Sequence, residues 1–343
     1  MLAVVKDKPK PGVTIKDVPE PTPKPGEVLV EVIYASICGT DIGIYDWIPW
    51  AEKHIKPPTI IGHEIVGEIV EINGDSSKLQ VGDLVSSETH IFCDRCDQCR
   101  FGNYHICENM QLFGISRDGS FAEYATIPIR TTWKNDKAIP VEHMSVQEPL
   151  GNAMHAVSKS QVGGRRVLVL GLGPVGLCAT AIAKANSPKE LSVVEPQKYR
   201  RDLLKEFAGV SAEKTYSDRM NDHFDIVFEM SGAVGGIESA FDAVRPGGTV
   251  VAFGIPKDRV VVPWGDKIIG KEIQILSVFG RKIWDTWKAT TDFLKSGEID
   301  ISKIITHEFE LKDFEKAMTT MKSGKSGKII LAPGAKPRFS SGS

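Results

Sequence analysis

The feature that most constrains the fold is a glycine turn between an apolar strand and a helix. Gly171, Gly173 and Gly176 form the pattern G-x-G-x-x-G, directly after the strand-like run Val167–Leu170 and before an apolar helical run. In this setting the first glycine permits a tight turn and the second lets the backbone approach a pyrophosphate. The third lets helix and strand pack closely. The motif therefore predicts a dinucleotide-binding unit.

Strands and helices alternate around this turn. β-prone runs at residues 167–170, 191–194, 225–228 and 249–253 are separated by helical runs at 177–184, 199–208 and 236–244. Such alternation predicts an α/β fold with a doubly wound parallel sheet. The short spacer between Phe207 and Phe224 predicts that one crossover of this sheet is trimmed.

The first 130 residues follow a different pattern, of short strands and turns. Glu64–Ile72 and Gly82–Val85 are examples, and few helical periods lie between such runs. Val13–Ile15 and Val28–Val30 flank a stretch rich in lysine and proline, where we expect short strands rather than a disordered arm. This part of the chain is therefore predicted to be mainly β.

An acidic residue after the glycine turn indicates the type of dinucleotide. Glu195 ends the next predicted strand, about 20 residues beyond the turn. A carboxylate there accepts hydrogen bonds from ribose hydroxyls and repels a 2′-phosphate, which favours NAD over NADP. Arg200 is a counter-signal, because it could hold a phosphate or stack near adenine. A glycine turn without a nucleotide is the alternative, but strand, turn, helix and acid are all in place.

Four cysteines within fifteen residues give the sharpest metal signal. Cys93, Cys96, Cys99 and Cys107 supply the thiolates of a closed tetrahedral zinc site, which stabilises structure and leaves no open position for substrate. An iron–sulfur cluster is the rival, but the gap before the fourth cysteine does not match that motif. Unliganded thiols are the remaining alternative. Catalysis is expected elsewhere.

A second constellation consists of residues that lie far apart in the sequence. Cys38 follows a predicted strand, His63 lies in Gly62-His63-Glu64, and Glu148 precedes the nucleotide-binding part. Together they would supply sulfur, nitrogen and oxygen ligands and leave a fourth position open, as catalytic zinc sites do. Each alone has a structural explanation, as a small core residue, a buried histidine or a helix cap. Spacing alone does not bring the three together.

Charge and hydropathy argue against nucleic acids and membranes as partners. The chain has 42 basic and 44 acidic residues among 343, and no dense basic cluster. The charge-free stretch Val167–Ala183 is interrupted by glycines and Pro174, so a strand, a turn and a helix explain it better than a membrane span. The N-terminus lacks a signal-peptide core. Because cysteines cluster without a secretion signal, we expect metal rather than disulfides, and a cytoplasmic protein.

These motifs together resemble the zinc-dependent medium-chain alcohol dehydrogenases across nearly the whole chain. The resemblance rests on Cys38-Gly39-Thr40-Asp41, Gly62-His63-Glu64-x2-Gly67, the four cysteines and the Glu148 segment. Within the family the chain is most similar to the L-threonine 3-dehydrogenases. The segments that carry this narrower likeness are 35–41, 44–51, 89–93, 148–153, 280–287 and 304–307.

The resemblance implies a domain arrangement. It implies a mainly β, GroES-like catalytic domain over residues 1–152, with a structural zinc lobe at 90–110, and a Rossmann domain for NAD over residues 153–297. Residues 298–343 would return to the catalytic domain. The resemblance also implies a homotetramer, with the strand at Ile273–Phe279 near a sheet edge where subunits could pair.

The resemblance also assigns roles to matching positions. Cys38 and His63 would bind a catalytic zinc, with Glu64 and Glu148 as alternating or outer carboxylates, and the four clustered cysteines would hold a second zinc. Thr40 would hydrogen-bond the alcohol and start a proton relay. His90 would lie on the substrate side, although packing beside the zinc lobe explains it equally well. The implied NAD contacts are Val175, Glu195, Arg200 and the backbone around Phe253, Gly254, Ile255, Val278 and Phe279.

The implied reaction is hydride transfer from a secondary alcohol to NAD, with L-threonine oxidised to 2-amino-3-ketobutyrate. One position departs from the pattern: threonine dehydrogenases carry a relay histidine three residues after the Thr40 position, and this chain has Gly43. A polyol or sugar dehydrogenase with the same zinc mechanism is therefore the alternative. A zinc-stabilised nucleotide-binding protein without catalysis is a further one, supported only by Gly43.

Overall fold

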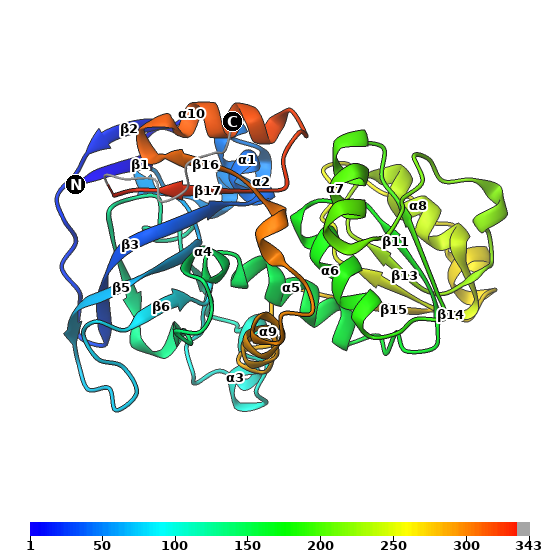
Figure 1. Ribbon diagram of the computed structural model, residues 1–343, viewed down its shortest axis with the longest axis horizontal. Coiled ribbons are helices and arrows are strands. Elements are labelled where there is room, and N and C mark those ends of the chain that lie inside the picture. Colours follow the sequence, from blue (N-terminus) through cyan, green and yellow to red (C-terminus); the bar gives the residue numbers. More distant parts are fainter. Residues whose placement is uncertain (335–343) are drawn as a thin grey trace. The chain divides into compact units, whose positions relative to one another are not determined.

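The computed structural model describes residues 1–334 and divides the chain into two compact units (Figure 1). The first unit contains Met1–Glu148 and the segment from Ile305 onward, and the second contains Pro149–Ile304. The first unit is therefore built from both ends of the chain, and the orange and red strands of Figure 1 lie among its blue and cyan ones.

The main sheet of the first unit runs in the order β10-β6-β5-β3-β17-β16, and β9 pairs with the beginning of β3. Its strands are β3 (Glu27–Ile37), β5 (Glu64–Asn73), β6 (Leu84–Ser87), β9 (Tyr124–Pro128), β10 (Thr132–Lys134), β16 (Ile305–Glu310) and β17 (Lys328–Ala332). In β3, Val28, Val30 and Val32 are buried at alternate positions, as expected of a strand with one face on a core. β3 and β5 pair antiparallel, so the end of β3 lies beside the beginning of β5, where Ser36 is opposite Glu64.

Shorter elements surround this sheet. The strands are β1 (Leu2–Lys6), β2 (Thr14–Asp17), β4 (Thr59–Ile60), β7 (His90–Ile91) and β8 (Gln111–Leu112). The helices are α1 (Gly39–Asp46), α2 (Pro49–His54), α3 (Asp97–Arg100), α4 (Val141–Met144) and α10 (Phe314–Lys322). The mainly β character predicted for this region holds. The sequence pattern did not predict α1 and α2, because both are short and α1 contains two glycines.

The second unit is a five-stranded sheet in the order β12-β11-β13-β14-β15, with every pair of neighbours parallel. The strands are β11 (Arg166–Leu170), β12 (Glu190–Val194), β13 (Phe224–Glu229), β14 (Val244–Ala252) and β15 (Gln274–Ser277). The helices are α5 (Gln147–Ser158), whose first two residues still belong to the first unit, α6 (Pro174–Ala185), α7 (Lys198–Ala208), α8 (Val234–Ala243) and α9 (Asp285–Ser296). The predicted doubly wound parallel sheet is confirmed.

The crossover that the sequence predicted to be trimmed lies between α7 and β13. In this segment Glu213 forms only an isolated parallel bridge with Val194, and a single 3₁₀ turn follows at Asp218–Met220. A strand at this place would be the next one outward from β12. Only its remnant is present, so β12 is the edge strand of the described sheet.

None of the helices within residues 1–334 is both long enough and apolar enough to span a lipid bilayer.

Candidate active site

Cys38 stands at the turn where β3 ends and α1 begins. Its backbone is extended, and it is the N-cap residue of α1. The Cys38 N–H donates to a carboxylate oxygen of Asp41 at 2.8 Å, which closes the first turn of the helix. The thiol is therefore held at the N-terminus of α1.

Asp41 also lies against His63. Asp41 is fully buried, and one of its carboxylate oxygens is 3.6 Å from Nδ1 of His63. Burial of His63 opposes its charge, but Asp41 and Cys38 beside it raise the pKa of His63 to about 10. Metal-bound histidines commonly present one ring nitrogen to a carboxylate in this way, which leaves the other nitrogen for the metal.

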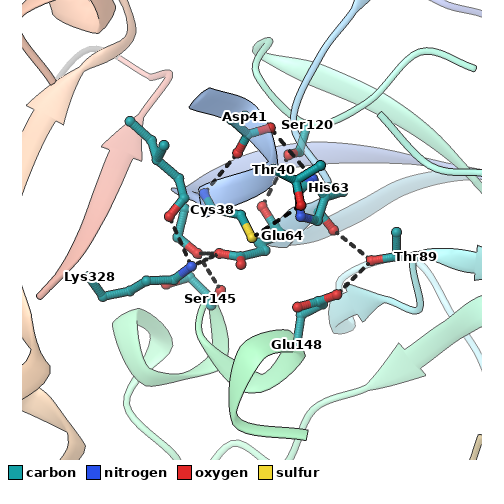
Figure 2. Close-up of polar contacts among 12 residues, drawn as sticks. Cys38, Thr40, Asp41, His63, Glu64, Thr89, Ser120, Ser145, Glu148 and Lys328 are labelled. Carbon is teal, nitrogen blue, oxygen red and sulfur yellow. Dashed lines mark hydrogen bonds and ion pairs between the residues drawn. The ribbon is translucent and has the colours of Figure 1, made fainter. Parts of the chain in front are cut away.

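Glu64, the next residue, is held by both ends of the chain (Figure 2). Ser36 donates its hydroxyl to one carboxylate oxygen of Glu64, and the Lys328 ammonium forms an ion pair with the same oxygen. Burial raises the pKa of Glu64, and Lys328 opposes that shift. The second oxygen, Oε1, is buried without a hydrogen-bond partner among the described residues. This oxygen is free to bind a cation.

Lys328 is itself fully buried and has a second anchor. Its ammonium donates to the carbonyl of Ile37 at 3.0 Å, one residue before Cys38. Burial disfavours its charge, but Glu64 and Cys38 hold the pKa of Lys328 above its ordinary value. A buried charge of this kind persists because it is paired and hydrogen-bonded.

Glu148 joins the same region through Thr89. The Thr89 hydroxyl lies 3.1 Å from Oε1 of Glu148 and 3.3 Å from the carbonyl oxygen of His63. Figure 2 shows Thr89 between these two residues, with Glu148 on the first turn of α5. Glu148 is therefore near the cluster, but it is not among the three residues whose ligand atoms lie closest together.

Those three residues are Cys38, His63 and Glu64, which offer one ligand atom each within 4.8 Å of one another. The donors are sulfur, nitrogen and oxygen, and the surrounding carboxylates favour a cation. Three protein donors would leave one tetrahedral position open, as in catalytic zinc sites. The residues present therefore fit zinc.

Thr40 and His90, which were also expected at this site, each contact a neighbouring side chain. The Thr40 hydroxyl lies 3.8 Å from Sγ of Cys38, at the start of α1. His90 is buried, and its Nδ1 lies 2.7 Å from Glu88, whose carboxylate also accepts the His90 backbone N–H at 2.9 Å. Glu88 was not anticipated. It fixes the orientation of the His90 ring.

The four clustered cysteines also fit a metal. Cys93, Cys96, Cys99 and Cys107 place one sulfur each within 4.8 Å of the others. Sγ of Cys96 is 3.5 Å from Sγ of Cys99 and 3.8 Å from Sγ of Cys107. A zinc tetrahedron with bonds of about 2.3 Å has sulfur–sulfur edges of about 3.8 Å.

The pKa values of this lobe support the same conclusion. Backbone N–H groups of Arg95 and Cys96 lower the pKa of Cys93 to about 6, whereas burial and the neighbouring Cys96 raise that of Cys99 to about 12. Burial and the neighbouring Cys96 therefore disfavour a charge on Cys99. A divalent cation would balance the charge of thiolates held this close together.

In the second unit the glycine turn opens a cavity. The cavity has a volume of about 520 Å³, and Gly171, Gly173, Glu195 and Arg200 are among its lining residues. A Cβ on Gly176 would lie 2.1 Å from the carbonyl oxygen of Gly171, so the turn requires glycine there. A Cβ on Gly173 would meet no atom within 4 Å, so this backbone is open to a ligand. Gly173 is also the N-cap of α6, where a pyrophosphate is favoured.

Glu195 supports the turn as well as facing the cavity. One carboxylate oxygen accepts the Leu172 N–H at 2.7 Å and the other accepts the Gln197 N–H at 2.8 Å. Val175 lies in the first turn of α6. Phe253, Gly254 and Ile255 follow β14, and Val278 and Phe279 follow β15. Because ligands of such sheets bind beyond the carboxyl ends of the strands, these residues occupy the expected edge.

The chain matches two family models in succession. Residues 24–137 match the alcohol dehydrogenase GroES-like domain, and residues 174–296 match the zinc-binding dehydrogenase domain. The chain is 41% identical over 340 residues to the L-threonine 3-dehydrogenase of Pyrococcus horikoshii, covering 96% of this chain and 98% of that one. The chain belongs to the zinc-binding alcohol dehydrogenase family.

The chain is also similar to other dehydrogenases. It is 41% identical to the L-threonine 3-dehydrogenase of Caldanaerobacter subterraneus, with 97% of this chain and 99% of that one covered. It also matches the crystal structure of 2R,3R-butanediol dehydrogenase from Bacillus subtilis, with 25% identity, a TM-score of 0.85, and 97% and 99% of the two chains covered. The predicted GroES-like and Rossmann-type fold is thus confirmed, and the chain is an oxidoreductase.

Sequence reasoning missed several residues of this dehydrogenase site. Ser36, Thr89 and Lys328 received no role, although each contacts a predicted site residue. Asp41 belongs to the motif Cys38-Gly39-Thr40-Asp41, but no function was predicted for it. Its signal was the capping pattern, in which an acidic residue at the third helical position supports the N-cap residue. The sequence indicates a role for Lys328 only weakly, through its position directly before the apolar run Ile329–Leu331.

Proposed function

We propose that this protein is a zinc- and NAD-dependent dehydrogenase that oxidises L-threonine to 2-amino-3-ketobutyrate. The proposal rests on the juxtaposition of Cys38, His63 and Glu64 in a site with one open position. Relatives named L-threonine 3-dehydrogenase, about 40% identical over nearly the whole chain, support this choice of substrate.

Zinc, when bound, would act as a Lewis acid that lowers the pKa of a bound secondary alcohol. NAD, when bound, would accept the hydride from the carbon that carries this alcohol. The chain itself holds the metal donors through Asp41, Ser36 and Lys328. The Thr40 hydroxyl, which lies 3.8 Å from Sγ of Cys38, would accept the alcohol proton and pass it on. The products would be the ketone, NADH and one proton.

We further propose that NAD is preferred to NADP. The Glu195 carboxylate lines the cavity beside the glycine turn, and its two backbone partners leave it lone pairs for ribose hydroxyls. A 2′-phosphate would meet this negative charge. Two zinc ions per chain, one at Cys38 and one at the four cysteines, belong to the same proposal.

A polyol or sugar substrate is a second candidate, favoured by one observation at Gly43. A Cβ at this position would lie 2.9 Å from the Cδ1 methyl of Ile48, so an apolar side chain occupies the space next to it. A relay histidine could not enter this space without displacing Ile48. The proton would leave by another path, and substrates that bring their own hydroxyl groups would be less affected.

Reduced nicotinamide absorbance would separate these candidates. The zinc-loaded protein would be mixed with NAD and with L-threonine, sorbitol, galactitol, glucose or 2,3-butanediol in turn. A kcat/KM for L-threonine well above the others is expected. A preference for a polyol or sugar would transfer the proposal to the second candidate. If none of these substrates were oxidised although zinc and NAD are bound, both candidate functions would be contradicted.

The assembly proposed for this enzyme is a homotetramer. It is supported by the edge strand β15, which exposes Ile275, and by the exposed Trp264 and Phe279. Apolar side chains on an unpaired edge are typical of surfaces that pair with another chain. The cytoplasmic location expected from the sequence stays a prediction.

A further inference from the structure

One face at the end of α5 is tied to the loop that follows β15. Nδ1 of His155 lies 3.0 Å from the carbonyl oxygen of Gly280. The Lys159 ammonium, directly after the helix, donates to the carbonyl of Ser277 at 2.8 Å. His155 and Lys159 are four residues apart and therefore lie on the same face of the helix. All of these groups belong to the second unit.

The chemistry of the His155 contact fixes its protonation. A backbone carbonyl can only accept, so Nδ1 of His155 must carry the hydrogen. Burial lowers the pKa of His155, with the positive charges of Lys159 and Arg281 acting in the same direction. His155 is therefore a neutral donor at neutral pH, and it points a defined N–H at the loop.

A third contact closes the loop at its far end. Arg281 is fully buried, and its guanidinium donates to the side-chain oxygen of Asn152 at 3.0 Å, one turn before His155. A Cβ on Gly151 would lie 2.7 Å from Cδ of Arg281, so the helix surface is hollowed where this side chain passes. Helix and loop are thus fitted to each other from Ser277 to Arg281.

The tied loop leaves the sheet directly after β15. Its first residue beyond the sheet, Val278, donates its N–H to Ala252 at 3.0 Å, and Gly280 has a positive φ of 59°. Phe279, between them, is half exposed. The loop leaves the carboxyl end of a parallel strand, which is where ligands of such sheets bind.

We propose that His155 and Lys159 are positioning residues that hold the backbone of residues 277–280 in the shape that receives the nicotinamide end of NAD. This inference rests on the proposed function. The adenosine end would lie in the separate cavity at Gly171 and Glu195. The two ends of the dinucleotide therefore depend on different parts of the unit, which makes the role testable by binding alone.

The test compares NADH with ADP-ribose, which lacks the nicotinamide. Affinities would be measured by NADH fluorescence and by calorimetry for His155→Leu, His155→Asn and Lys159→Met. Asparagine places an amide N–H near the position of Nδ1, so it is the conservative variant. Lys184→Met is the matched control, because Lys184 makes the same kind of bond to the carbonyl of Ala208 at the end of α7.

We expect His155→Leu and Lys159→Met each to weaken NADH binding about five- to tenfold, the size of one net hydrogen bond. ADP-ribose affinity and zinc content should stay unchanged, and His155→Asn should recover most of the loss. Because Lys159 is exposed, its variant tests the proposal even where His155→Leu fails to fold.

Two results would overturn the inference. The first is an unchanged NADH affinity in Lys159→Met. The second is an equal loss for NADH and ADP-ribose, which would indicate a general structural role. If the unaltered protein bound neither ligand, the proposed function would fail and the inference with it.

Discussion

At the scale of single residues, the site is built from buried charges that support one another. Cys38 and His63 were predicted from their types and motifs, and Glu64 was implied by the family resemblance. Their supports were not, because Lys328 meets Glu64 from the other end of the chain and no local pattern marks that contact. A lysine before an apolar run ordinarily reaches solvent. Here it is fully buried, since an ion pair and the Ile37 carbonyl satisfy it.

Replacing Lys328 with methionine should strongly destabilise the first unit. Removing one partner leaves the Glu64 carboxylate buried without compensation, which costs about 3–5 kcal/mol. The double variant Lys328→Met/Glu64→Gln should recover part of that loss. Urea denaturation would measure both changes.

Lys322→Met is the control for this prediction. Lys322 pairs with Asp46 at 2.7 Å, but both side chains are partly exposed, so less than about 1 kcal/mol is expected. If the two methionine variants lowered the free energy of unfolding equally, the buried ion pair would contribute no more to stability than the exposed one.

Replacing Glu195 with alanine should change both cofactor preference and stability. The ribose hydroxyls of NADH would lose the carboxylate that accepts their hydrogen bonds, so the affinity for NADH should fall about tenfold. The 2′-phosphate of NADPH would no longer be repelled, so the preference for NADH over NADPH should become smaller. The N–H groups of Leu172 and Gln197 would also lose their acceptor, at about 1–3 kcal/mol where they stay buried. Kd values for both cofactors and a thermal melt would test this. An unchanged ratio of the two Kd values would refute the role in cofactor choice.

At the scale of elements, the locally encoded features were the predictable ones. The glycine turn and the four-cysteine lobe each occupy a short contiguous segment, so spacing alone indicates their chemistry. The helices α1 and α2 were missed because tertiary contacts stabilise them more than an amphipathic period does. The trimmed crossover was visible in the sequence because a full strand and helix do not fit between Phe207 and Phe224.

The four-cysteine lobe should depend on its metal. Cys99→Ser should lower the zinc content from two ions to one per chain and reduce the thermal stability, because structural zinc contributes directly to folding. Cys178→Ser, at a buried cysteine of α6 outside the lobe, is the matched control and should keep both ions. Elemental analysis would decide. Two ions retained in Cys99→Ser would contradict a four-sulfur site.

At the scale of the whole molecule, the edge strand β15 should govern association. Ile275→Lys places a charge on the exposed face of this strand, so assembly should weaken and the measured mass should fall toward the 37.5 kDa of one chain. Sedimentation equilibrium would measure it. Val81→Lys, which charges an exposed apolar position of the first unit, should leave the mass unchanged. Equal masses for Ile275→Lys and the unaltered protein would contradict pairing through this edge.

The placement of β17 inside the first sheet has a consequence for the order of biosynthesis. β17 lies between β3 and β16 and carries Lys328, yet it leaves the ribosome after the whole second unit. Until then β3 lacks its second neighbour along Ala35–Ile37, on the side opposite β5, and Glu64 lacks its counter-charge. The metal site therefore matures only after β17 has been translated, and a nascent chain that stops before β17 would carry Cys38, His63 and Glu64 without the Lys328 ion pair.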